Sequence, residues 1–181
     1  MKCPVCKKGS LESEDVIENL KTKACRLCGG RWIQSFQYWK WLDRHGQTLQ
    51  ELPAAEVTEL PLDDSPAGKL CPECGHFLTQ RKVGHGADFH LDRCNCCGGI
   101  WFDKNEWETL HSRNLHDKVH FVFSAAWQKQ VRDEESSETF EKRIQSILGP
   151  DDYEKLKQTA AWINSHPQKN TILSYMMNWK P

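Results

Sequence analysis

Two stretches of the chain alternate between hydrophobic and polar positions, as the strands of β-hairpins do. Residues 77–83 and 89–94 predict two strands, and the glycines within 84–88 permit the positive φ angles that the turn between them needs. A first hairpin is expected within residues 11–23, with Glu18-Asn19 as its turn. The hydrophobic pattern thus predicts two small antiparallel hairpins.

Each hairpin is followed by a segment with helical spacing. The first helix is expected over residues 35–44 with Gly46 at its C′ position. Asp103 and Glu106 form a capping-box-like start for a second helix, which runs to about Arg113. The first helix carries four aromatic residues, more than one face can bury against a hairpin, so we expect some to meet another domain or a partner.

Residues 115–181 contain no cysteine and repeat apolar residues at helical spacing. Gly149-Pro150-Asp151 reads as the end of one helix and the start of the next, and Pro167 ends a later one. We expect about four helices here. Their apolar faces comprise Leu115, Val119, Val122 and Ala126; Phe140, Ile144, Ile147 and Leu148; Tyr153, Leu156, Ala160 and Ile163; and Ile172, Met176 and Trp179.

Composition places the chain among globular proteins of one or two small domains, with 181 residues, 27% charged and 38% hydrophobic. Residues 51–68 hold five acids and no base, and three prolines lie within 47–68, which predicts an acidic linker. Residues 1–50 hold nine Lys or Arg against five Asp or Glu, a balance of +4. Nucleic acid is therefore a possible partner through residues 1–50, although a dedicated binder usually has a more basic domain.

Eight of the nine cysteines form one pattern written twice, a CxxC pair followed by a second CxxC pair and Gly-Gly-x-Trp. A tetrahedral zinc site needs four thiolates from two tight turns, so the pattern predicts two Zn²⁺ ions per chain. A four-cysteine iron centre uses the same geometry, and unligated thiols are a further alternative. The expected ligands are Cys3, Cys6, Cys25 and Cys28 in the first site, and Cys71, Cys74, Cys94 and Cys97 in the second.

The segment from Cys94 to Glu106 closely resembles the transcription-factor-IIB-type zinc-ribbon family. That family reads Cys-x-x-Cys-Gly-Gly-x-Trp, a hydrophobic residue, Asp, and Glu three residues later. Residues 3–42 resemble it with lower fidelity, because Gln34 and Gln37 replace the Asp and the Glu. The resemblance implies two zinc ribbons with the eight ligands given above, and it supplies no catalytic residue.

These observations predict a small α+β fold with two zinc ribbons, each a hairpin plus a short helix, and a C-terminal helical subdomain. The expected domains are residues 1–46, the linker 47–68, residues 69–114 and residues 115–181. The first ligand lies at Cys3, so cleavage of a leader would destroy the site, and we expect no signal peptide. Reduced thiolates and the absence of a membrane-spanning apolar run favour a cytoplasmic protein.

Several other residues are candidates for contacts or chemistry. Aromatic and basic residues that interleave in and before the first helix could bind single-stranded nucleic acid, although a core role with outward charges is favoured. Cys96 is interpreted as a tolerated knuckle residue rather than a reactive thiol or an alternative ligand, and His116 and His120 as a polar helix face rather than a metal site. The candidate partner contacts are Arg31, Tyr38, Trp39, Lys40, Trp41, Arg44, Arg81, Lys82 and His85.

The sequence predicts a non-enzymatic zinc-binding adaptor. A closed four-thiolate shell leaves no open position for substrate, and no nucleophile, paired-carboxylate or phosphate-loop pattern is evident. A protein or nucleoprotein partner is expected, with the transcription or translation machinery suggested by analogy of fold alone. A redox protein with iron or thiol chemistry at the four-cysteine sites is the alternative.

Overall fold

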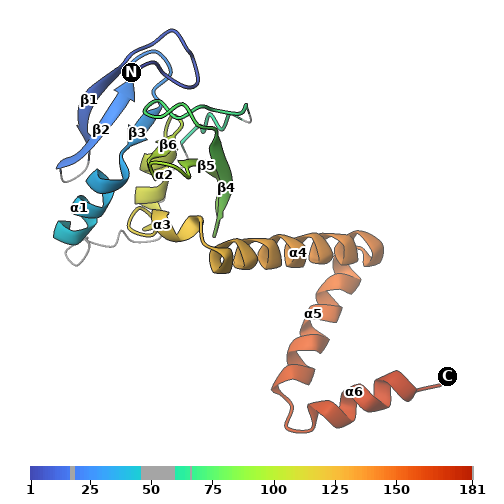
Figure 1. The fold of residues 1–181 in the computed structure, drawn as a ribbon. Helices are drawn as coiled ribbons and strands as arrows, with labels where there is room; N and C mark the ends of the chain where they lie inside the picture. The colour runs from blue at the N-terminus through green and yellow to red at the C-terminus, as the bar shows by residue number, and fades with distance from the viewer. Residues whose placement is uncertain (17–18, 46–59, 66, 181) are drawn as a thin grey trace. The chain divides into compact units, whose positions relative to one another are not determined.

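The computed structural model describes residues 1–16, 19–45, 60–65 and 67–180 (Figure 1). The chain divides into two compact units, residues 1–131 and 132–181. Both ribbons belong to the first unit, and the boundary expected after residue 114 lies inside it. The turn residue Glu18, the C′ residue Gly46 and most of the expected linker lie outside the described residues.

Each ribbon has the same four elements in the same order, and the expected α+β class is confirmed. The first ribbon consists of β1 (Leu11–Val16), β2 (Leu20–Cys25), β3 (Arg31–Ile33) and α1 (Ser35–His45). The second consists of β4 (Leu78–Gly84), β5 (Ala87–Cys94), β6 (Ile100–Phe102) and α2 (Glu106–Ser112). The hairpin turn of the second ribbon is tight, because His85 and Gly86 both adopt positive φ, 52° and 80°.

The two ribbons share one sheet with strand order β1-β2-β3-β6-β5-β4, in which every neighbouring pair is antiparallel. Its central pair joins the ribbons, with Trp32 directly opposite Trp101. The sequence analysis missed β3 and β6, because strands of three residues are too short to show a readable hydrophobic period. The sheet order is symmetric about this central pair.

The first unit has two groups of buried side chains. One surrounds the cysteines and includes Trp32 and Trp101. The larger one lies under the helices and includes Tyr38, Trp41 and Trp107. Here Trp41 and Trp107 pack edge to face, with ring centroids 5.8 Å apart.

Residues that follow the second ribbon cover it. Helix α3 (Val119–Val122) buries Val119 and Val122, and α4 (Ala125–Leu148) then begins beside the β4–β5 turn. The Trp127 indole N–H donates to the Val83 carbonyl at 2.7 Å, and the Gln128 amide donates to the Lys82 carbonyl at 2.8 Å. Of the expected linker, Leu62 packs against the core. The first residues after 114 therefore stabilise the second ribbon.

The second unit contains the rest of α4, α5 (Pro150–Ser165) and α6 (Lys169–Asn178). Gly149, with φ of 78°, separates α4 from α5, and Pro150 occupies the first turn of α5, as the sequence predicted. Among the described residues of this unit, Ile163 is the one large apolar side chain that is buried. Among the described residues, no helix combines the length and apolar character needed to cross a membrane.

Candidate metal centres

The first four-cysteine site joins the turn before β1 to the end of β2. The Sγ atoms of Cys3 and Cys28 are 3.5 Å apart, and those of Cys6 and Cys25 are 3.6 Å apart. All four sulfurs lie within 4.8 Å of one another. Four thiolates about 2.3 Å from a tetrahedral zinc are separated by about 3.8 Å, so this cluster is the right size for one ion.

The second site repeats this arrangement at the matching positions of the second ribbon. Its Cys71 and Cys97 sulfurs are 3.6 Å apart, and its Cys74 and Cys94 sulfurs are 3.3 Å apart. All eight predicted ligand cysteines are free. Sulfurs this far apart are not disulfide-bonded, since that bond is about 2.05 Å long. Both predicted ligand sets are therefore brought together.

The protein environment shifts the pKa values of most of the ligand thiols. The backbone N–H of Gly9 donates to Cys6 Sγ at 3.3 Å and lowers the pKa of that thiol to about 7. The pKa of Cys74 is likewise lowered to about 7, chiefly by the backbone N–H of His76. Burial instead raises the pKa values of Cys3, Cys28, Cys71 and Cys97. A bound cation would offset the mutual repulsion of the sulfurs, and this soft all-sulfur donor set fits Zn²⁺.

The Gly-Gly-x-Trp motifs of the two ribbons pack against each other, and this reciprocal contact fixes the position of one ribbon relative to the other. A Cβ atom placed on Gly30 would overlap Cζ2 of Trp101, and one placed on Gly99 would overlap Cζ2 of Trp32. Both indoles are fully buried. The second glycine of each motif thus makes room for the tryptophan of the other ribbon, and we call this contact the seam.

The second ribbon also contains a buried polar network. The Lys69 ammonium lies 2.6 Å from the Asp92 carboxylate and 2.9 Å from that of Asp103. Asp103 accepts the Trp101 indole N–H at 2.7 Å, and its own backbone N–H donates to Glu106 at 2.7 Å. The last bond is half of the expected capping box, but Asp103 turns inward instead of capping α2. Burial raises the pKa of Glu106 to about 9, so this carboxyl is protonated at neutral pH.

The first ribbon lacks this network. Gln34 and Gln37 stand at the positions of Asp103 and Glu106, and the buried indole N–H of Trp32 has no hydrogen-bond partner among the described residues. Arg31 instead pairs with Glu14 at 3.0 Å and with Glu108 of the second ribbon at 2.6 Å. The sequence analysis did not single out Lys69 or Asp92, because nothing local shows that they meet.

Both ribbons match a known family. Residues 2–44 and 70–113 match the profile of the family described as Transcription factor zinc-finger, the TFIIB-type zinc ribbon. The chain carries two tandem TFIIB-type zinc ribbons. No curated protein and no solved structure matches the chain significantly. The family and the geometry together support zinc binding at two sites.

The structure separates the candidate contacts around the first zinc ribbon into two groups. Tyr38 and Trp41 are buried at 3% exposure, and their rings belong to the core, the alternative that the sequence favoured. Arg31 is held by its two carboxylates. Trp39 is 48% exposed, and Lys40 and Arg44 are also exposed, so these three remain available on α1.

The candidate contacts near the tip of the second hairpin also divide into side chains held by other residues and an exposed one. Lys82 pairs with Asp88 at 2.8 Å, and the His85 ring packs edge-on against Trp127 with centroids 4.5 Å apart. Arg81 is exposed, and its guanidinium donates to the carbonyl of Gln80. The start of α4 therefore occupies part of this tip.

The remaining candidates fall outside the two zinc sites. Cys96 is exposed, and its sulfur lies within 4.8 Å of ligand atoms of Cys74 and His76. His116 is buried beside Trp41 and Trp107, and burial lowers its pKa to about 4. His116 precedes α3, so it does not share a helix with His120, and neither joins a possible metal cluster in the part of the chain described here.

Proposed function

We propose that this protein is a non-enzymatic zinc-binding adaptor that holds a protein partner, or the protein component of a nucleoprotein, through its helical unit. The observation that carries this proposal is the apolar surface of residues 132–180. Exposed there are Phe140, Ile147, Leu148, Leu156, Trp162, Leu173, Tyr175, Met176, Met177 and Trp179. Large apolar side chains that a small unit leaves in water favour burial against another protein.

The metal sites suit a structural role in such an adaptor. Each shell is closed by four sulfurs, which leaves no position for substrate. The seam and the continuous sheet fix one ribbon against the other, so the pair presents a rigid surface. By analogy of fold, the transcription and translation machineries are the first places to seek a partner.

Metal analysis of the natively purified chain is the first test. Two zinc ions per chain and a colourless solution are expected. Substantial iron with visible colour would instead favour the redox alternative. The result separates the two functions before any partner is sought, because tetrathiolate iron absorbs visible light and zinc does not.

The partner is then tested by quantitative capture with matched variants of the full chain. Trp162→Glu and Met177→Glu place charges on exposed apolar positions, 55% and 84% exposed in the wild type, and should not disturb folding. Gln158→Glu adds a charge at an exposed polar position of α5 and serves as the control. We expect the wild type and the Gln158→Glu control to retain specific proteins. The Trp162→Glu and Met177→Glu variants should lose them. Equal retention by all four chains would refute the proposed surface.

A further inference from the structure

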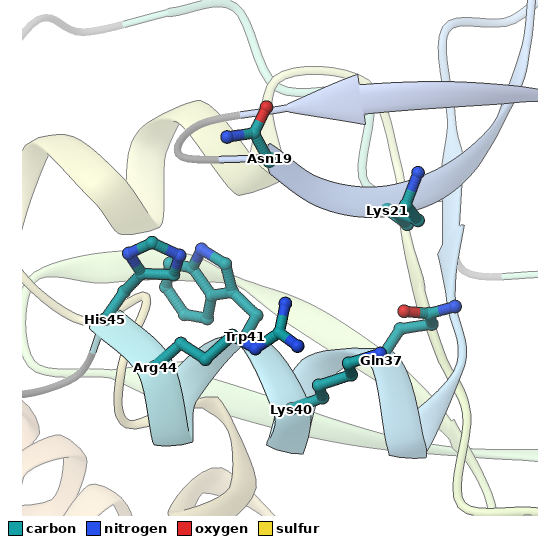
Figure 2. A pocket seen from close by; sticks show the side chains of 7 residues that line it. All are labelled: Asn19, Lys21, Gln37, Lys40, Trp41, Arg44 and His45. Carbon is teal, nitrogen blue, oxygen red and sulfur yellow. The ribbon is translucent and has the colours of Figure 1, made fainter.

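A basic pocket lies between the first hairpin and α1, away from both metal sites (Figure 2). Its volume is about 310 Å³. Side chains from the start of β2 form one wall, and one side of α1 forms the other. The polar lining residues are Asn19, Lys21, Gln37, Lys40, Arg44 and His45.

The lining is rich in hydrogen-bond donors and contains no acidic residue. Lys40 and Arg44 are spaced i, i+4, so their side chains lie on one face of α1. Neither forms an ion pair with another described residue. Lys21 has a distant contact, 3.7 Å, with the exposed carboxylate of Asp15. Three permanent cations thus line one space, and of the three, Lys21 alone has an ion pair with a described residue.

Trp41 forms the inner wall of the pocket. Its ring is held by Tyr38 and Trp107, at centroid distances of 5.9 Å and 5.8 Å. Its buried indole N–H has no hydrogen-bond partner among the described residues. Figure 2 shows the nitrogen edge of this ring facing the hairpin. A buried donor without an acceptor is costly, and an acceptor in the pocket would satisfy it.

We propose that this pocket binds a backbone phosphate of a single-stranded nucleic acid. Cationic and neutral N–H donors around one space match the acceptor oxygens of a phosphate, and an arginine can engage two of them at once. Arg44 and His45 lie in the last turn of α1 and offset the partial negative charge of the helix end.

This site goes beyond the proposed adaptor function and does not depend on it. The adaptor surface lies in residues 132–180, whereas the pocket lies in the first ribbon. The capture experiment and a nucleic-acid experiment therefore use different variants, and either proposal can fail while the other stands.

The test measures binding of a fluorescently labelled 12-nucleotide single strand, as RNA and as DNA, to the zinc-loaded full chain. Fluorescence anisotropy is recorded between 50 and 300 mM KCl. Lys40→Ala/Arg44→Ala removes two exposed pocket cations. Lys129→Ala/Arg132→Ala removes the same charge from an exposed helical i, i+3 pair elsewhere and is the matched control. Zinc content and circular dichroism establish that all variants are folded.

We expect the pocket variant to bind at least 10-fold more weakly. The slope of log K against log[salt] should become shallower by about 0.7, because each phosphate contact of a single strand contributes about 0.7 and the pocket holds one phosphate. The control should change affinity less than 2-fold. Equal losses in both variants, or no binding by the wild type, would overturn the proposal.

Competition identifies the source of the anion. Inorganic phosphate, a nucleoside monophosphate and a poly-glutamate peptide are added at matched ionic strength. The proposal requires the unlabelled single strand to displace the probe at far lower phosphate concentration than either small phosphate. Displacement by a small phosphate at equal concentration, or by poly-glutamate as readily as by the strand, would overturn it.

Discussion

Besides its zinc ligands, the second ribbon buries four ionisable side chains, Lys69, Asp92, Asp103 and Glu106. The first ribbon has Gln34 and Gln37 at the positions of Asp103 and Glu106. It also has Lys23 opposite Trp32, where the second ribbon has Asp92 opposite Trp101. The zinc ligands, strand order and seam are nevertheless common to both. The comparison indicates that the ribbon fold depends on the cysteines and the Gly-Gly-x-Trp motif. The buried polar network is not required for the fold, because the first ribbon lacks it. A buried ion pair is weak evidence for stability in itself, because desolvation offsets its attraction.

Removal of one zinc ligand is the strongest way to ask whether the ribbons are independent. Cys25→Ser opens the first shell, and we expect zinc to fall from two ions to one per chain. Structural zinc contributes roughly 10–16 kcal/mol in small finger peptides, so the first ribbon should unfold. Because β3 pairs with β6, Trp101 should then become exposed. Elemental analysis and tryptophan fluorescence measure the two effects. A second ribbon with unchanged fluorescence would show that the seam contributes little.

Breaking the buried network tests the contrast between the copies directly. Lys69→Met leaves the carboxylates of Asp92 and Asp103 buried without their cation, which should cost about 3–5 kcal/mol of unfolding free energy. Lys23→Met, at the position opposite Trp32, should cost under about 1 kcal/mol, since Lys23 is partly exposed and forms no ion pair with a described residue. Urea unfolding of the zinc-loaded protein compares them. Similar losses would mean that the network is not specific to the second ribbon.

Overpacking the seam should affect both copies alike. Gly99→Ala and Gly30→Ala each place a methyl group against a buried indole, and we expect each to cost about 3 kcal/mol. Gly68→Ala, where an added Cβ meets nothing within 4 Å, is the control and should change stability by less than about 0.5 kcal/mol. Thermal unfolding at fixed zinc concentration gives the comparison. Tolerance at Gly99 with intolerance at Gly30 would show that the seam is not reciprocal.

Glu106→Gln makes the second ribbon resemble the first, and its effect depends on pH. The pKa of Glu106 is about 9 in the folded chain and about 4.5 when exposed. Between these values the folded state keeps a proton that the unfolded state has lost, so wild-type stability falls as pH rises from 4.5 to 9. The glutamine variant lacks this loss and should be more stable by up to about 3 kcal/mol near pH 7. Urea midpoints at pH 6, 7 and 8 measure it. A constant difference between the proteins across this range would contradict the assigned protonation.

The sequence was sufficient for features whose cause is local. CxxC spacing determined all eight ligands, because four thiolates from two tight turns leave little freedom. Glycine positions and helical spacing placed the second hairpin, α1 and the break between α4 and α5. The acid and amide differences between the copies were also readable, at Gln34 and Gln37.

Tertiary structure decided how the copies combine. The pairing of β3 with β6 and the fit of each tryptophan over a distant glycine depend on surfaces that meet only after both ribbons fold. The same reason explains why Tyr38 and Trp41 are core, why Lys69 meets Asp92 and Asp103, and why Lys21 joins Lys40 and Arg44 around one pocket. The sequence by itself thus determined the two metal shells, and only packing between residues far apart in the chain turned two ribbons into one block with a shared sheet.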